Sequence, residues 1–286
     1  MNISKIPYLG PITKKLFLAT LGICDNNSLK HLKKSTRIHG EKIYSAITEL
    51  NQYSSKPKHK IIEAIEAERV RLLQDTSTLV DDTLGNAVEH DIGVSIKRAC
   101  EASKDYKAAL FLYFLTKNLN PVNVIELGTN VGISSSYIAL ALQESANKSH
   151  LTTLDASLYR QSHARKIHEK LNFTNIDYVE GFFTDTLEDT LQAMQQPVDL
   201  AFIDGHHQYK PTLAYFNQIY KYASKNAVFV FDDIRWSKGM KLAWEELRND
   251  ERFDYIVDLY SVGVAVISES ASQKPEKYPI IYNKMY

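Results

Sequence analysis

The stretch VIELGTNVGIS, residues 124–134, joins a β-branched apolar run to the start of a helical pattern through a short turn. Its glycines, Gly128 and Gly132, have a GxxxG spacing. A dinucleotide-binding turn requires GxGxxG, and a phosphate-loop NTPase requires a terminal Gly-Lys-Ser/Thr, so neither pyrophosphate motif is present. The glycines either let the backbone approach a ligand closely or serve only tight packing of strand on helix. The turn alone does not decide between these two interpretations.

Outward from this turn, strand-like and helix-like patterns alternate. Five apolar runs, each followed by a helical pattern, predict parallel strands with helices on both faces. Two further strand runs lie too close together for a helix between them, so we expect antiparallel neighbours there. The prediction is a doubly wound, Rossmann-like α/β fold with seven mostly parallel strands, at residues 123–127, 150–155, 175–181, 198–204 and 227–233, and two within 253–268.

Acidic residues stand at the carboxyl ends of four predicted strands, the edge at which open α/β sheets bind ligands. They are Glu126, Asp155, Asp204, and Asp232 with Asp233. Asp155 follows Glu126 by 29 residues, about one βαβ unit, and an acid there is placed to hold ribose hydroxyls. Ser134 starts the helix after the first turn, and its hydroxyl together with the helix N-terminus suits a ligand carboxylate.

Three of these carboxylates, Asp204, Asp232 and Asp233, end adjacent strands and are expected to converge. Uncompensated anions in one cleft repel one another, and a hard divalent cation removes the conflict. Oxygen ligands favour Mg²⁺, with Mn²⁺ or Ca²⁺ as alternatives, over zinc. His206 as a further ligand would shift the preference toward Mn²⁺ or Fe²⁺. In the alternative interpretation, Asp233 caps the following loop and Asp232 accepts from backbone amides.

The ordered set of motifs resembles a known family. VIELGTNVGIS and TLDAS, residues 153–157, resemble the first two motifs of class I S-adenosylmethionine-dependent methyltransferases. FIDGHHQY, residues 202–209, and FVFDDIRWSKG, residues 229–239, resemble the metal-dependent O-methyltransferase branch, which includes the catechol-type and macrocin-type enzymes. The resemblance covers residues 104–268.

The resemblance implies S-adenosylmethionine as cofactor and assigns roles to individual residues. It places metal ligands at Asp204, Asp232 and Asp233. His207, three residues after Asp204, stands where this branch has a lysine or histidine base, and an imidazole can accept a proton at neutral pH. Gly205 is expected to let the chain turn sharply before His207, because it has no side chain in the way. The implied cofactor-binding residues are Glu126, Gly128, Thr129, Asn130, Ser134, Asp155, Ala156, Gly181, Phe182 and Asp204.

One departure from the family pattern lies after the third predicted strand. Many relatives have Gly-Asp-Ala beside the adenine, whereas this chain has Gly181-Phe182-Phe183. Phe182 or Phe183 is a candidate for stacking on the adenine ring, and Asp185 for binding its amine. Arg235, Trp236 and Lys238 follow the fifth strand and either contact the acceptor or form a solvated loop.

The domain prediction is an N-terminal helical cap and connector at 1–103, a methyltransferase domain at 104–268 and a C-terminal tail at 269–286. We expect the cap and the connector near 76–103 to shape the acceptor pocket. The tail is polar and then aromatic, which is consistent either with disorder or with docking on a second copy in a homodimer. His168 lies in a polar helical pattern and is expected at the surface.

The composition limits the partners. Lys plus Arg and Asp plus Glu number 34 each, so the balanced charge predicts no nucleic-acid or membrane-surface partner. The two cysteines, Cys24 and Cys100, form no disulfide or zinc pattern and fit a cytoplasmic location. We expect a small-molecule hydroxyl as methyl acceptor. Two alternatives stay open: a metal-independent N- or C-methyltransferase, and a non-catalytic binding protein with the same fold.

Overall fold

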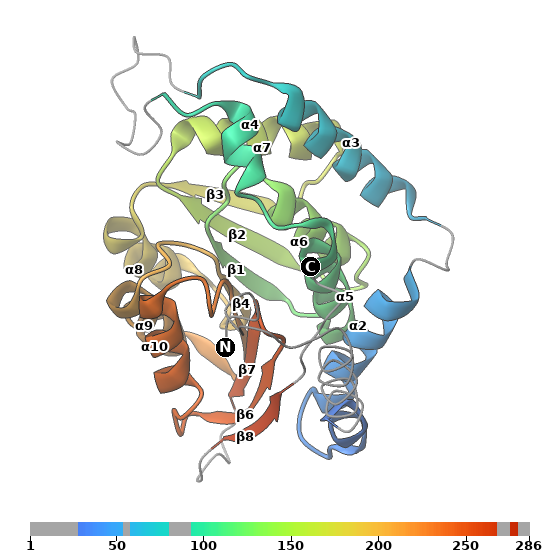
Figure 1. Ribbon diagram of the computed structural model, residues 1–286, viewed down its shortest axis with the longest axis vertical. Coiled ribbons are helices and arrows are strands. Elements are labelled where there is room, and N and C mark those ends of the chain that lie inside the picture. The colour runs from blue at the N-terminus through green and yellow to red at the C-terminus, as the bar shows by residue number, and fades with distance from the viewer. Residues whose placement is uncertain (1–27, 54–57, 80–92, 268–274, 280–286) are drawn as a thin grey trace, which may run out of the picture.

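The structure is a computed structural model that describes residues 28–53, 58–79, 93–267 and 275–279. Its centre is an eight-stranded sheet with strand order β3-β2-β1-β4-β5-β7-β6-β8 (Figure 1). The strands are β1 (Asn123–Leu127), β2 (His150–Asp155), β3 (Ile176–Glu180), β4 (Val198–Ile203), β5 (Ala223–Phe231), β6 (Phe253–Asp258), β7 (Gly263–Ile267) and β8 (Glu276–Pro279).

The sheet confirms the predicted doubly wound fold. The neighbours from β3 to β5 are parallel, and β7 runs antiparallel to both β5 and β6, as the short connection between the last two strand runs predicted. Strand β1 pairs with β2 on one side and with β4 on the other. The chain therefore reverses its direction of winding beside β1, and the crevice at this switch point is where such sheets bind ligands.

The eighth strand comes from residues that the sequence placed in the C-terminal tail. Residues 276–279 pair in parallel with the edge strand β6. Tyr278 is buried and packs edge-to-face against Tyr255, with ring centroids 5.8 Å apart. The prediction of seven strands was therefore one short, while the rest of the predicted tail, 269–274 and 280–286, lies outside the described residues.

Helices cover both faces of the sheet (Figure 1). Successive strand residues point to opposite faces, so Val124 belongs to one buried cluster and Ile125 to the other. The Val124 cluster takes in α5 (Tyr106–Leu119), α6 (Ile133–Gln143) and α7 (Leu158–Lys170). The Ile125 cluster takes in α8 (Phe183–Ala193), α9 (Tyr209–Tyr220) and α10 (Lys238–Leu247).

The N-terminal helices share the core of the sheet. They are α2 (Gly40–Gln52), α3 (Lys60–Gln74) and α4 (Ile96–Glu101). Helix α2 packs on α5, which in turn packs on α6. Ile43 of α2 and Ile62 of α3 are buried in the same cluster as Val124. Parts of the predicted cap and connector, residues 1–27, 54–57 and 80–92, lie outside the described residues.

Candidate active site

A cavity of about 430 Å³ opens at the carboxyl ends of β1, β2 and β4. Residues 102–104, which lead into α5, close one side of it. The start of α8 and the turn after β4 close the other. Most of the predicted cofactor and catalytic residues line it: Gly128, Thr129, Asn130, Ser134, Asp155, Ala156, Phe182, Asp204 and His207.

Gly128 brings the turn after β1 against the turn after β4. Its φ is +109°, which L-residues rarely adopt, and a Cβ there would lie 2.4 Å from the carbonyl oxygen of Asp204. The backbone amide of Asp204 donates to the carbonyl of Leu127 at 2.9 Å. A glycine is therefore required for the two turns to meet beside the cavity.

A buried polar chain stands behind the turn after β1. Gln161 donates to Thr129 Oγ1 at 3.4 Å, the hydroxyls of Thr129 and Thr153 lie 2.7 Å apart, and Thr153 donates to Glu126 Oε2 at 2.7 Å. The side chains of these residues are fully buried. Burial raises the pKa of Glu126 to about 8, against the hydrogen bonds from Ser134 and Thr153, which lower it. Glu126 and Thr129 thus support the turn from behind, and the sequence did not point to Thr153 or Gln161.

A neutral Glu126 predicts a specific dependence of stability on pH. Its pKa is raised in the folded protein, so between roughly pH 5 and 8 the folded state holds a proton that the unfolded state has released. This group's contribution to the free energy of unfolding is present at low pH and falls by up to ~1.4 kcal/mol per pH unit across that window. In Glu126→Gln the fall should disappear. Urea unfolding of both proteins at pH 5.5 and 7.5, without cofactor, tests this; equal pH slopes would contradict it.

Asp155 organises the part of the cavity between the turns after β1 and β2. Its Oδ2 accepts from the backbone amide of Asn130 at 2.7 Å and its Oδ1 from that of Ser157 at 2.8 Å. Asn130, in a left-handed conformation with φ 47°, donates from its side chain to the carbonyl of Ala99 at 2.9 Å and to Ser103 Oγ at 3.3 Å. The turn after β1 is therefore tied both to the end of β2 and to the segment before α5.

Two phenylalanines border the cavity at the start of α8. Phe182 is 53% exposed, and Phe183 packs edge-to-face on Tyr215 with ring centroids 5.4 Å apart. Gly181 does not line the cavity, but its amide donates to the carbonyl of Asp155 at 3.0 Å and so positions the phenylalanines. Asp185, the candidate for the adenine amine, also lies outside the lining, whereas its neighbour Thr184 is part of it.

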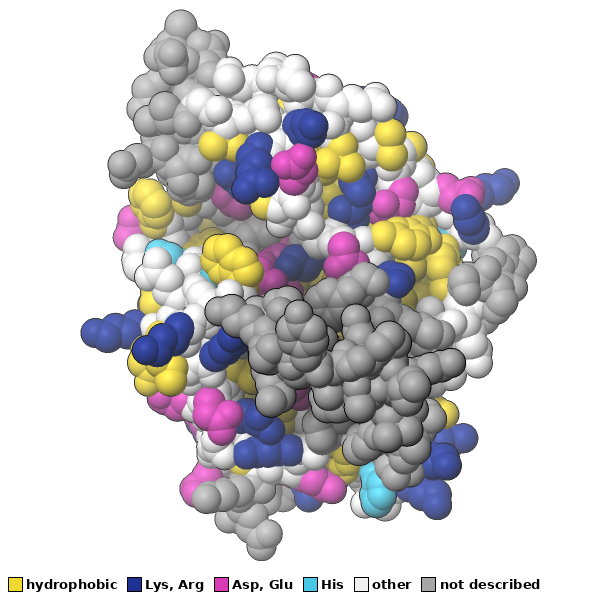
Figure 2. Space-filling model, in the orientation of Figure 1, with side chains coloured by type: hydrophobic (Ala, Val, Ile, Leu, Met, Phe, Trp, Pro, Cys, Tyr) yellow, Lys and Arg dark blue, Asp and Glu magenta, His cyan; other side chains and the backbone are white. Residues whose placement is uncertain are grey.

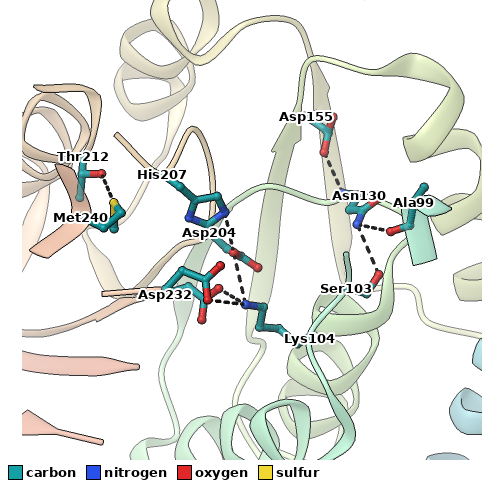
Figure 3. A network of polar contacts seen from close by, with 11 residues as sticks. Ala99, Ser103, Lys104, Asn130, Asp155, Asp204, His207, Thr212, Asp232 and Met240 are labelled. Carbon is teal, nitrogen blue, oxygen red and sulfur yellow. Dashed lines mark hydrogen bonds and ion pairs between the residues drawn. The ribbon is translucent and has the colours of Figure 1, made fainter. Parts of the chain in front are cut away.

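The three strand-end carboxylates converge on one lysine. Figure 3 shows Lys104 beside Asp204 and Asp232. Lys104 Nζ makes a short ion pair with Asp232 and lies 3.7 Å from Asp204 Oδ1 and 4.0 Å from Asp233 Oδ1. Asp232 is 1% exposed, and the Lys104 side chain 11%. The sequence predicted the convergence of the carboxylates but not Lys104, which stands 100 residues before Asp204 in the chain and carries no motif of its own.

The two histidines take different positions. His206 and His207 both have left-handed backbones, with φ 67° and 42°. His206 Nδ1 lies 2.7 Å from the Tyr215 hydroxyl. His207 Nε2 lies 3.5 Å from Asp204 Oδ1, and its ring meets Trp236 edge-to-face at 5.7 Å. The histidines, and not Gly205, supply the left-handed turn, and such strain in non-glycine residues is typical of functional sites.

Gly205 serves packing instead of the turn. A Cβ at this position would lie 2.4 Å from the Phe183 ring, so glycine leaves room for that ring. The chain does turn sharply here, with the His207 amide donating to the Gly205 carbonyl at 2.8 Å, but the left-handed residues of the turn are the two histidines.

Burial raises the pKa of the neighbouring Asp204 carboxyl, whereas the charges of Lys104 and His207 lower it. His207 Nδ1 is buried without a hydrogen-bond partner among the described residues.

The loop after β5 is divided between structural and exposed residues. Arg235 forms a bidentate ion pair with Asp258, at 2.7 and 2.6 Å, so its guanidinium is committed to the loop. Trp236 is 72% exposed beside His207 and is the residue of this loop best placed to touch an acceptor.

On the face of the molecule shown in Figure 2, acidic and basic side chains are interspersed among the described residues. Among the described helices, none is both long and apolar enough to span a bilayer.

Comparison with known proteins agrees with this geometry. Residues 125–234 match the family model Methyltransf_24, described as a methyltransferase domain. Residues 125–234 are therefore similar to a methyltransferase domain. This match and the doubly wound fold confirm the resemblance to the class I group that VIELGTNVGIS and TLDAS indicated.

Individual relatives of the methyltransferase domain are distant. Uncharacterized protein R132 of Acanthamoeba polyphaga mimivirus is 31% identical over 121 residues, 40% of this chain and 53% of that protein. Tapetum-specific methyltransferase 1 of Arabidopsis thaliana is 30% identical over 132 residues, 45% of this chain and 53% of that protein. The chain thus spans about half the length of the curated relatives it matches.

Solved structures share the fold at low sequence identity. The O-methyltransferase from Bacillus cereus, crystallised with SAH, is 20% identical and superposes with a TM-score of 0.52. The match covers 78% of this chain and 98% of that one. The likeness extends well beyond residues 125–234, so most of the chain belongs to the common fold.

Proposed function

We propose that the protein transfers the methyl group of S-adenosylmethionine to the hydroxyl of a small molecule. The observation that carries the proposal is that one cavity is lined both by the proposed cofactor-binding residues Gly128 and Asp155 and by the proposed reactive pair Asp204 and His207. Its volume of about 430 Å³ suits a ligand of nucleoside size. The relative from Bacillus cereus, solved with the product form of this cofactor, supports the choice of cofactor.

The residues present fit S-adenosylmethionine. Gly128 lets the turns after β1 and β4 meet beside the cavity, and Asp155, which lines it, has carboxylate oxygens able to accept from ribose hydroxyls. Phe182 and Phe183 offer apolar surfaces for a flat base. When bound, the cofactor supplies a methyl group on a sulfonium centre, which leaves as a neutral thioether as the new carbon–oxygen bond forms.

The chain's own residues would handle the acceptor. We assign His207 Nε2 to take the hydroxyl proton, because the ring lies at the cavity and its other nitrogen, Nδ1, is buried. Asp204 Oδ1, 3.5 Å from Nε2, would stabilise the imidazolium that forms. Trp236 extends an exposed aromatic surface next to His207 and suits a flat or hydrophobic acceptor. A cytoplasmic location and a homodimer stay predictions from the sequence.

The predicted divalent cation competes with a group of the chain itself. Asp204, His207 and Asp232 each offer a ligand atom, all within 4.8 Å of one another, so the donor set alone could hold an ion. However, Lys104 Nζ already lies among these oxygens. As folded, the site does not fit a further dication, and no step of the proposed reaction depends on one.

Removal of Asp155 should weaken cofactor binding. In Asp155→Ala we expect the affinity for S-adenosylmethionine to fall about 10- to 100-fold, a loss of about 1.5–3 kcal/mol of binding free energy, because the ribose hydroxyls lose their acceptor. The melting temperature should fall as well, because the amides of Asn130 and Ser157 lose theirs. Calorimetric titration measures the affinity, with Asp177→Ala, an exposed aspartate on β3, as control. Unchanged affinity in Asp155→Ala would remove the ribose assignment.

The proposed reaction is tested by product analysis. The protein is incubated with S-adenosylmethionine carrying a deuterated methyl group and with panels of phenols, catechols, sugars and amines. Mass spectrometry should find the label on oxygen. Transfer to nitrogen or carbon would replace the proposal with the alternative acceptor class. Cofactor binding without transfer to any panel would favour the non-catalytic alternative.

A further inference from the structure

We propose that the Lys104 ammonium group is the resident cation of the Asp204–Asp232–Asp233 cluster and does there the work predicted for a divalent metal. It would compensate the carboxylates and hold the oxygen of the acceptor hydroxyl. The part that concerns the acceptor rests on the function proposed above. The part that concerns the cation rests only on the cluster's geometry.

The burial of the cluster requires a positive charge. Asp232 is 1% exposed and Asp204 13%, and a buried carboxylate without compensation is strongly unfavourable. Lys104 Nζ contacts Asp232 and lies within 4.0 Å of both other carboxylates. No other Lys or Arg side chain among the described residues forms an ion pair with these three aspartates. An ion bound to the same oxygens would have to displace the ammonium, so the two cations exclude one another.

Lys104 is held in place along its backbone, unlike a surface lysine that visits the cluster. Arg69 donates to the Lys104 carbonyl at 2.6 Å. On one side, Asn130 binds Ser103 Oγ, and on the other, Asp105 caps α5 by accepting from the amides of Lys107 and Ala108 at 2.8 and 3.1 Å. These three anchors fix the backbone around Lys104, and the ion pair with Asp232 holds the ammonium before any ligand binds, which is the preorganisation that electrostatic catalysis needs.

The position of Lys104 gives it access to the reaction. Lys104, Asp204 and His207 line the same cavity (Figure 3). An ammonium group has three N–H donors. Only the contact with Asp232 is short, whereas those with Asp204 and Asp233 are 3.7 and 4.0 Å, so the carboxylates do not use all three donors. The remaining donor can point to the acceptor oxygen. As the hydroxyl proton passes to His207, the ammonium would stabilise the negative charge that develops on that oxygen.

Manganese binding tests the assignment without any acceptor. The signal of free Mn²⁺ in electron paramagnetic resonance is followed during titration of wild-type protein, Lys104→Met and the control Lys107→Met, an exposed lysine three residues on. Lys104→Met removes the ammonium and exposes the oxygens to metal. It should bind about one Mn²⁺ at least ~10-fold more tightly than wild-type protein or the control. Tight one-to-one binding by wild-type protein would overturn the proposal, as would a folded Lys104→Met variant that gains no binding.

Activity and cofactor binding separate this proposal from the function on which it partly rests. With the acceptor found in the product screen, wild-type turnover should survive EDTA. Lys104→Met should lose at least ~10²-fold in EDTA and recover in part with Mn²⁺, while its affinity for S-adenosylmethionine stays within a few-fold. Full turnover of Lys104→Met in EDTA would overturn the role of the ammonium. If wild-type protein binds no S-adenosylmethionine, the proposed function fails, but the manganese titration still decides the cation. If Lys104→Met does not fold, the wild-type titration and Lys104→Arg, which keeps the charge and should keep EDTA-resistant turnover, decide it.

Discussion

His207→Ala is expected to lower turnover by about 10²–10⁴-fold while the affinity for S-adenosylmethionine stays nearly unchanged. The ring lies beside the cavity, and Asp204 Oδ1 is 3.5 Å from its Nε2. No other imidazole among the described residues contacts Asp204. The loss should shrink for acceptors whose hydroxyl is already acidic, because these need less help to lose their proton. Steady-state kinetics with a phenol series of graded acidity would measure both effects.

His206→Ala is the matched control for this prediction. Both histidines have left-handed backbones, so alanine brings a similar conformational cost at either position. His206 instead contacts the Tyr215 hydroxyl, so we expect its loss to lower turnover far less than that of His207. Wild-type turnover in His207→Ala, together with an inactive His206→Ala, would show that the other histidine is the base.

Gly128→Ala is expected to abolish measurable cofactor binding and to lower the melting temperature. A Cβ there would lie 2.4 Å from the Asp204 carbonyl oxygen, a backbone atom that cannot move aside cheaply. The φ of +109° adds strain of about 1–3 kcal/mol. The turns after β1 and β4 would have to separate, and both line the cavity. Calorimetry with S-adenosylmethionine and thermal denaturation would measure the two effects.

Gly93→Ala is the control for Gly128→Ala, because it introduces a similar backbone strain without a close contact between two turns. Gly93 also has a positive φ, 72°, but a Cβ there would meet no atom of the described part of the chain within 4 Å. It should therefore lose some stability and keep its cofactor affinity. If Gly128→Ala behaves like Gly93→Ala, the contact between the two turns is not what shapes the cavity.

The sheet was predictable because its signals are local. Alternating runs gave the strands, and parallel strands necessarily bring their carboxyl ends to one edge, so the convergence of Asp204, Asp232 and Asp233 followed from strand order. The eighth strand was missed because a short segment such as 276–279 pairs only after the edge of β6 exists. A segment this short is not long enough to show the alternation of apolar and polar residues that predicts a strand.

The details of the site depended on contacts that no local pattern encodes. Lys104 reaches the cluster because the segment that leads into α5 lies beside the turns after β1 and β4. In the sequence, a lysine just before a helix gives no sign of such a contact. His168 was expected at the surface and is instead buried: its Nδ1 lies 2.6 Å from the Tyr178 hydroxyl and its Nε2 3.2 Å from the Gly132 carbonyl. Neighbours on β3 and in the first turn satisfy this polar ring, and those partners become visible only in three dimensions.

Cofactor binding at the cavity is the claim on which the proposed function and the roles of the site residues depend. Calorimetric titration of S-adenosylmethionine into wild-type protein tests it most directly, because it needs neither the acceptor nor a metal. We expect one-to-one binding with a dissociation constant in roughly the micromolar range, weakened in Asp155→Ala and lost in Gly128→Ala. Folded wild-type protein that gives no binding heat and no thermal shift at ~1 mM cofactor would contradict it.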